Sequence, residues 1–153
     1  MATLLLCATT GSATAGGTEN TYPAAIAAGH WVADARMSSS LAKTPETNYW
    51  WVGRMWGEIA ETGKVTMRAE NGCSILGVLT DRSLEGLRGE VEITRCAQTS
   101  MNRRYRATVY GGPVDGRGKG LRISLASSQH GGGNGLLDTW SVEGAFIRYQ
   151  PTN

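Results

Sequence analysis

The side chains that could support catalysis are few and widely spaced in this chain. His30 and His130 are its two histidines, and no motif places them together. His130 precedes three glycines, which is typical of a mobile loop and unsuited to a tuned general base. Asp115 and Asp138 could form a carboxylate pair, although thirteen acidic residues make coincidental pairs common. We therefore assign no catalytic residue and expect a non-enzymatic protein, with a small hydrolase or isomerase as an alternative.

Motifs for nucleophilic, nucleotide and metal chemistry are incomplete. No Gly-x-Ser-x-Gly elbow occurs, and Gly116–Gly120 fails the phosphate-loop pattern because neither Ser nor Thr follows Lys119. Two of the three cysteines, Cys73 and Cys96, are expected to be bridged, which leaves no Cys/His set for zinc. The sequence therefore predicts neither a metal nor a cofactor.

The tryptophans near the middle of the chain are the strongest candidates for binding. Tyr49, Trp50 and Trp51 are consecutive, and Trp56 follows soon after. On a strand, Trp50 and Trp56 share one face and Trp51 lies on the other, because side chains alternate. One face could line a pocket for a small apolar ligand or stack on sugar rings. The alternative is plain packing in the core and at its rim.

A glycine-rich loop is the second candidate binding element. Residues Gln129 and His130 open this loop, which runs to Gly135. A mobile loop at the mouth of a barrel can admit or cover a ligand. We therefore place Gln129 and His130 beside the tryptophans as candidate ligand or partner contacts.

Arginines gather around one connection and on the neighbouring strands: Arg95, Arg103, Arg104, Arg106 and Arg122. They could form a basic stripe for an anionic partner such as lipopolysaccharide, phospholipid headgroups or nucleic acid. The net charge is only +2, and Glu90 and Glu92 are expected on the adjacent strand. A solvated sheet face of mixed charge is therefore favoured, and nucleic-acid binding is not expected.

The first residues are typical of an export-signal remnant. Leu4–Ala8 is a short apolar run, and Ala13–Ala15 supplies an A-x-A cleavage pattern. No Lys or Arg precedes the apolar run, so a leader with no targeting role is the alternative. No other stretch approaches the ~20 apolar residues that span a bilayer. We expect a signal over 1–15, no transmembrane segment, and a soluble periplasmic or secreted protein.

The cysteine count agrees with export. Loss of the signal would delete Cys7 and leave an even pair, Cys73 and Cys96. Lipidation of Cys7 is disfavoured by Leu6 directly before it. The turn-rich stretch 81–86 separates two strand-like segments, so a hairpin could bring Cys73 and Cys96 within bridging distance. The sequence predicts this disulfide, with two reduced, buried thiols in a cytoplasmic protein as the alternative.

Alternation of apolar and polar residues predicts an all-β domain over 29–153, after a flexible lead-in at 16–28. Lys64–Glu70 alternates cleanly and is followed by Asn71-Gly72, a strong hairpin signal. About eight strands are expected, near 30–36, 49–60, 63–70, 73–80, 86–96, 103–110, 119–127 and 138–149. Short strands in series with one apolar face favour an antiparallel up-and-down β-barrel, with a β-sandwich as the alternative.

The ends of this domain resemble those of calycin barrels, the lipocalin-type superfamily. Gly29-His30-Trp31 and Arg148 are similar to the early Gly-x-Trp and late Arg of that family. The resemblance implies that Trp31 closes the base of the barrel, that Arg148 packs over it, and that both are structural. The segment 71–77, with the later Cys96, also resembles a pattern in uncharacterised secreted bacterial proteins, which implies no activity.

The sequence as a whole indicates an exported, non-enzymatic binding protein. It would take a small apolar or sugar-like ligand at the barrel mouth, or a partner at the Trp-rich surface. The alternative is a structural or inhibitory subunit of a cell-envelope complex, with another envelope protein as the partner. A hollow interior would favour the ligand binder, and a filled interior with exposed tryptophan would favour the subunit.

Overall fold

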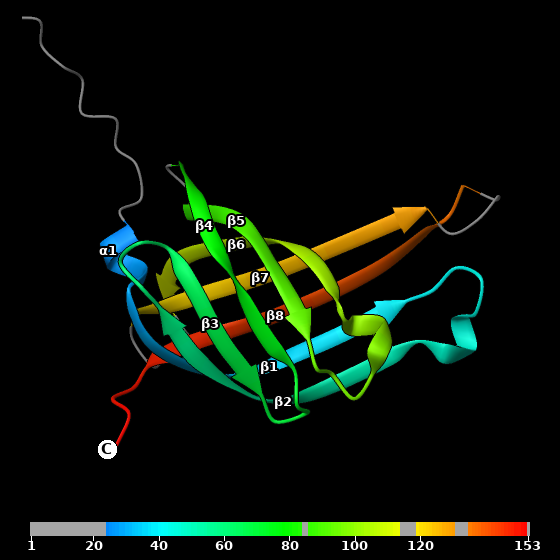
Figure 1. Ribbon diagram of the computed structural model, residues 1–153, viewed down its shortest axis with the longest axis horizontal. Helices are drawn as coiled ribbons and strands as arrows, with labels where there is room; N and C mark the ends of the chain where they lie inside the picture. Colours follow the sequence, from blue (N-terminus) through cyan, green and yellow to red (C-terminus); the bar gives the residue numbers. More distant parts are fainter. Residues whose placement is uncertain (1–23, 84–85, 114–118, 131–134, 153) are drawn as a thin grey trace, which may run out of the picture.

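The computed structural model describes residues 24–83, 86–113, 119–130 and 135–152. Its strands form a closed barrel in which each strand is antiparallel to the next and β8 pairs with β1 (Figure 1). The strands are β1 Gly29–Ser40, β2 Tyr49–Ile59, β3 Lys64–Ala69, β4 Ser74–Ser83, β5 Gly86–Thr94, β6 Arg103–Pro113, β7 Lys119–His130 and β8 Leu137–Arg148. The predicted up-and-down barrel is confirmed, and the alternative sandwich is wrong.

Alternating burial explains why these segments form strands. In β3 every second residue, beginning with Val65, is buried, and the residues between them are exposed. The buried residues of all eight strands point into the barrel and form a single hydrophobic core. A half-buried antiparallel sheet requires this period of two, and it is the pattern from which the strands were predicted.

The first strand is longer than its sequence indicated. Alternation of apolar residues ends at Met37, yet β1 runs on to Ser40. Ser38 and Ser39 lie opposite Ser141 and Trp140 of β8, and the hydroxyl oxygens of Ser38 and Ser141 are 2.9 Å apart. The strand therefore continues through Ser38–Ser40 because these residues pair with β8, although their side chains are polar.

One end of the barrel, its base, is closed by the short helix α1, Ala24–Ala27. The indole N–H of Trp31 donates to the carbonyl of Ala27 at 2.8 Å. Arg148 donates to the carbonyl of Ile26 at 3.0 Å and lies over the Trp31 ring, 4.8 Å from its centroid. Figure 1 shows α1 and the C-terminus at this same end. These bonds tie the lead-in to the first and last strands.

The other end, the mouth, is covered by the connection that contains the 3-10 turn η2, Thr99–Met101. Met101 is fully buried, and the Tyr105 hydroxyl donates to its carbonyl at 3.0 Å. A disulfide joins Cys73, just before β4, to Cys96, just after β5. The predicted bond is confirmed, and it lies at the ends of the β4–β5 hairpin.

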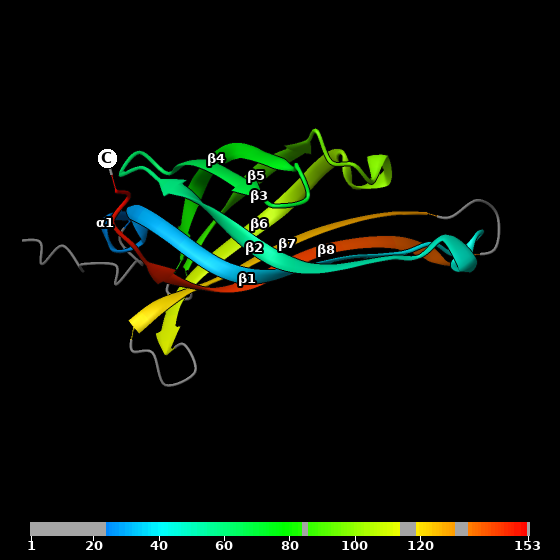
Figure 2. The ribbon, with the colours of Figure 1, turned by 90° about the horizontal axis from the view of Figure 1, so that it is seen from below.

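Four strands run beyond the barrel as an open sheet in the order β2, β1, β8, β7. Pairing of β2 with β3 begins only at Met55, and pairing of β7 with β6 ends at Ala126. The residues past these points, 49–53 of β2 and 127–130 of β7, pair only with β1 and β8. Figure 2 shows these four strands continuing together past the others, toward η1, Pro45–Thr47. We call this part the extension.

Candidate functional site

The barrel interior is filled with side chains. A void of about 10 Å³ lies among the core residues, and it suits at most a single water molecule. It is lined by Met55, Ile59, Val65, Met67, Ile75, Leu79, Val91, Ala107, Val109, Ile123 and Leu125. The described interior therefore has no room for a ligand, and any binding surface lies on the outside.

The mouth is also packed. The guanidinium of Arg103 lies 3.1 Å from the ring centroid of Trp140, which is almost wholly buried. Burial lowers the pKa of Arg103, and this outweighs the nearby Tyr105 and Asp138, which raise that pKa. Burial also raises the pKa of Tyr105. These side chains and η2 close the mouth of the barrel, where a small ligand was expected.

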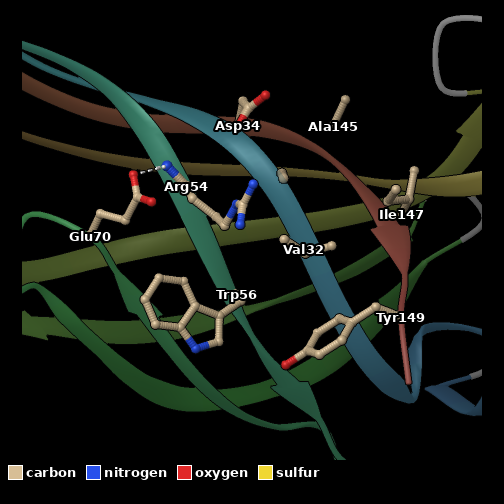
Figure 3. Close-up of a pocket in the computed structure, with 9 residues that line it drawn as sticks. Val32, Asp34, Arg54, Trp56, Glu70, Ala145, Ile147 and Tyr149 are labelled. Atoms are coloured by element: carbon tan, nitrogen blue, oxygen red, sulfur yellow. Dashed lines mark hydrogen bonds between the residues drawn. The ribbon is translucent and has the colours of Figure 1, made fainter. Parts of the chain in front are cut away.

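An apolar groove lies on the outer face of β8, β1 and β2, where side chains alternate with the core residues. It measures about 580 Å³, and its apolar lining comes chiefly from Val32, Trp56, Ala145, Ile147 and Tyr149. In Figure 3, Trp56 of β2 and Tyr149 just after β8 lie on either side of Val32 of β1. We call this the Trp56 groove.

Charged groups line one end of the Trp56 groove. Asp34 and Arg54 are direct cross-strand partners, and Glu70 lies beside them. The Glu70 carboxylate accepts from the Arg54 main-chain N–H at 3.0 Å, as Figure 3 shows. Among the described residues, no hydrogen bond or ion pair engages the Asp34 carboxylate or the Arg54 guanidinium. The groove thus combines an apolar floor with one free charge of each sign.

The predicted tryptophans divide between the two faces of β2, as alternation required. Trp50 and Trp56 lie outside, with Trp50 63% exposed, and the Arg36 guanidinium lies 4.8 Å from the Trp50 ring centroid. Trp51 and Tyr49 lie on the inner face, where both pack partly buried against the core. The Tyr49 hydroxyl accepts from the Asn71 side-chain amide at 3.3 Å. Only Trp50 and Trp56 are therefore placed to meet a partner.

The structure does not bring Gln129 and His130 to the tryptophans. Both are exposed at the end of β7, opposite Asp138 and Leu137 of β8. In the extension, β8 and β1 separate them from Trp50 on β2. Residues 131–134 lie outside the described residues, so the predicted loop is not tested.

The residues considered for catalysis are also apart. His30 lies at the base, with its ring centroid 5.9 Å from that of Tyr149, while His130 lies at the far end of the extension. The Asp138 carboxylate accepts from the main-chain N–H of Ala42 at 2.7 Å. Asp115 lies outside the described residues. In the part of the chain that the structure describes, no three His, Cys, Asp or Glu side chains group as metal ligands.

Arg104, Arg106 and Arg122 lie exposed on strands of mixed charge, whereas Arg103 packs over Trp140 at the mouth. Arg104 and Arg106 of β6 are direct cross-strand partners of Glu92 and Glu90 of β5. Arg122 of β7 lies across from Tyr110 and Ala145. The predicted proximity of these acids and bases is confirmed, and it weakens the case for a continuous basic stripe.

Several residues of the outer surface were missed in the sequence. Val52, which is 58% exposed, follows from the same alternation that pairs Trp50 with Trp56. Val32, Ile147 and Tyr149 could not be found in this way, because only barrel closure places β8 beside β1.

The stacking of Arg148 on Trp31 is the arrangement that the calycin resemblance implies, while membership of that superfamily stays a prediction. No described helix is long and apolar enough to cross a membrane. A Cys73–Cys96 disulfide is typical of proteins in oxidising, extracellular compartments. No protein-family model, curated protein or solved structure matches the chain.

Proposed function

We propose that this chain is an exported, non-enzymatic binding protein that recognises another protein through the Trp56 groove. The observation that carries the proposal is the combination of a filled interior with an apolar groove outside it. Between a partner subunit and the carrier of a small ligand, this combination favours the partner subunit.

The lining of the groove indicates what it would hold. Apolar side chains of a partner segment could pack against Trp56, Val32 and Ile147. The free charges of Asp34 and Arg54 would fix its orientation through a basic and an acidic group. Tryptophan in a partly enclosed site is a frequent centre of binding energy, so Trp56 is the expected hot spot.

The disulfide supports the exported part of the proposal. Cys73 and Cys96 are bonded, and such bonds persist mainly in oxidising compartments. A cell-envelope protein is therefore the partner that we propose. A structural or an inhibitory subunit would use the same surface.

Selection of displayed random peptides on the purified protein tests this function. We expect the selected peptides to bind the wild-type protein and to bind the Trp56→Ala variant at least about tenfold more weakly. Leu76→Ala is the matched control, because Leu76 is an exposed apolar residue on β4, outside the groove. Peptides that bind Trp56→Ala as tightly as they bind Leu76→Ala would argue against the groove as the site.

A further inference from the structure

The segment Tyr49–Gly53 of β2 has a neighbouring strand on one side only. It pairs with β1 from Ser39 opposite Tyr49 to Ala35 opposite Gly53. Pairing with β3 on the other side begins at Met55. In the described part of the chain, nothing pairs with the outer side of this segment, which we call the β2 edge.

The main chain of Arg54 shows which groups face outward along the β2 edge. Its N–H donates to the Glu70 side chain and its carbonyl accepts from the Glu70 N–H, both at 3.0 Å. Both Arg54 groups therefore point away from β1. Because this direction alternates along a strand, the N–H and C=O of Trp50 and Val52 also point away from β1. Neither residue has a main-chain partner on that side among the described residues.

The β2 edge is apolar and unprotected. The side chains of Trp50 and Val52 are 63% and 58% exposed, and neither Lys nor Pro occurs between Tyr49 and Gly53. The open edge of β7 differs, since it consists of Ser127, Ser128, Gln129 and His130. Natural sheets usually guard an exposed edge with charge or proline, because a bare apolar edge is a template for another strand.

Main-chain groups of the residues that flank the β2 edge already have hydrogen-bond partners. The N–H of Asn48 donates to the carbonyl of Pro45 at 3.2 Å, and both main-chain groups of Arg54 are taken by Glu70. Among the described residues of this segment that face outward, Trp50 and Val52 alone have both a free N–H and a free C=O. We propose that the β2 edge pairs antiparallel with the β2 edge of a second copy of this chain, about a two-fold axis at Trp51.

One register satisfies all the free groups. With Trp50 opposite Val52 of the second copy, both symmetry-related pairs exchange two N–H···O bonds. Placing Trp50 opposite itself would set Val52 against Asn48, whose N–H is used. Placing Val52 opposite itself would set Trp50 against Arg54, whose groups are also used.

The chosen register also suits the side chains. It sets an aromatic residue beside a β-branched one twice, which is a favourable cross-strand pair. Arg54 would lie opposite Asn48, so no like charges meet across the edge. Neither of the residues that pair, Trp50 and Val52, lines the Trp56 groove, so the self-pairing is a separate contact from the proposed function.

Sedimentation of the full chain over a wide concentration range tests the pairing. We expect a monomer–dimer equilibrium for the wild-type protein and a monomer for Val52→Pro, which removes a hydrogen-bond donor on the outer side. Val52→Thr keeps the N–H and the β-branched shape, so this control should still dimerise. Trp56→Ala should dimerise like the wild type. A wild-type protein that stays monomeric up to about 1 mM, or a dimer that survives Val52→Pro, would overturn the proposal.

Amide hydrogen exchange of the wild-type protein tests the same contact without relying on a variant that folds. We expect the amides of Trp50 and Val52 to become protected as the concentration rises. Exchange at Arg54 should not change, because its N–H is bonded to Glu70 in the monomer. Dimers that form with no added protection at Trp50 and Val52 would contradict the proposal.

Discussion

At the scale of single residues, buried aromatic rings with a polar atom close both ends of this barrel. Trp31 donates its indole N–H to Ala27 of α1 at the base, and Tyr105 donates its hydroxyl to Met101 of η2 at the mouth. Each ring contributes apolar area to the core while its polar atom holds a closing segment. The closing segments are thereby fixed to the wall by bonds that lie away from water.

Stability at alkaline pH should depend on Tyr105. Burial raises the pKa of its phenol above the ordinary value of 10.0, so the folded protein keeps the proton that the unfolded chain loses. The stability that depends on the protonated Tyr105 phenol is fully present below pH 10.0 and declines above it. We expect the unfolding free energy to fall by up to about 1.4 kcal/mol per pH unit there. Urea unfolding across this range measures the slope.

The Tyr105→Phe variant isolates the effect. It should lose about 1 kcal/mol at neutral pH, because the bond to Met101 is absent, and it should show a shallower decline at alkaline pH. A variant whose stability falls with pH as steeply as that of the wild type would assign the decline to other groups.

At the scale of elements, unequal strand lengths create the surfaces that matter. β2 has 11 residues and β3 has 6, so β3 covers only the half of β2 that lies in the barrel. The covered half carries Trp56 and contributes to the groove, while the uncovered half carries Trp50 and Val52 at a free edge. Strand β2 thus contributes to both proposed contact surfaces.

Close approach of β4 and β5 depends on glycine. A Cβ at Gly89 would overlap the carbonyl oxygen of Val78, whereas a Cβ at Gly112 would meet nothing within 4 Å. We expect Gly89→Ala to lower the unfolding free energy by about 1–3 kcal/mol, because the two strands must separate. Denaturant unfolding checks the value against Gly112→Ala as the control. Equal stability of the two variants would mean that the strands adjust without cost.

At the scale of the whole molecule, a packed barrel serves as a rigid support for its outer surface. Core side chains fill the interior almost without voids, and segments of chain cover both ends. Dense packing of this kind holds the outward residues of β1, β2 and β8 in fixed relative positions. The Trp56 groove is therefore formed before any partner arrives, which lowers the entropic cost of binding.

The disulfide should stabilise the molecule without shaping it. Cys73 and Cys96 are 23 residues apart and lie at the paired ends of one hairpin. Replacing both by Ala should cost about 3 kcal/mol, chiefly because the unfolded chain gains freedom, while the barrel still forms. Denaturant unfolding gives the cost, and circular dichroism reports the fold. Free thiols at both positions in protein recovered from outside the cytoplasm would contradict the bond and weaken the proposed export.

Much of the barrel could be predicted because its information is local. Alternation in Lys64–Ala69 marks a strand and its buried face without reference to any other part of the chain. The same rule correctly separated Trp50 and Trp56 from Trp51, and the paired cysteines followed from the hairpin between them. It failed at Ser38–Ser40, where contacts with β8 extend β1 although the residues are polar.

The sequence by itself determined most of each strand, the inward faces and the disulfide, since these depend mainly on neighbours close in the chain. Only the tertiary structure decided that the interior is filled, because void volume depends on how eight strands close on one another. Closure also placed Ile147 and Tyr149 beside Val32 and Trp56, more than ninety residues away along the chain. The candidate site thus belongs to the seam between the first and last strands, which no local pattern encodes.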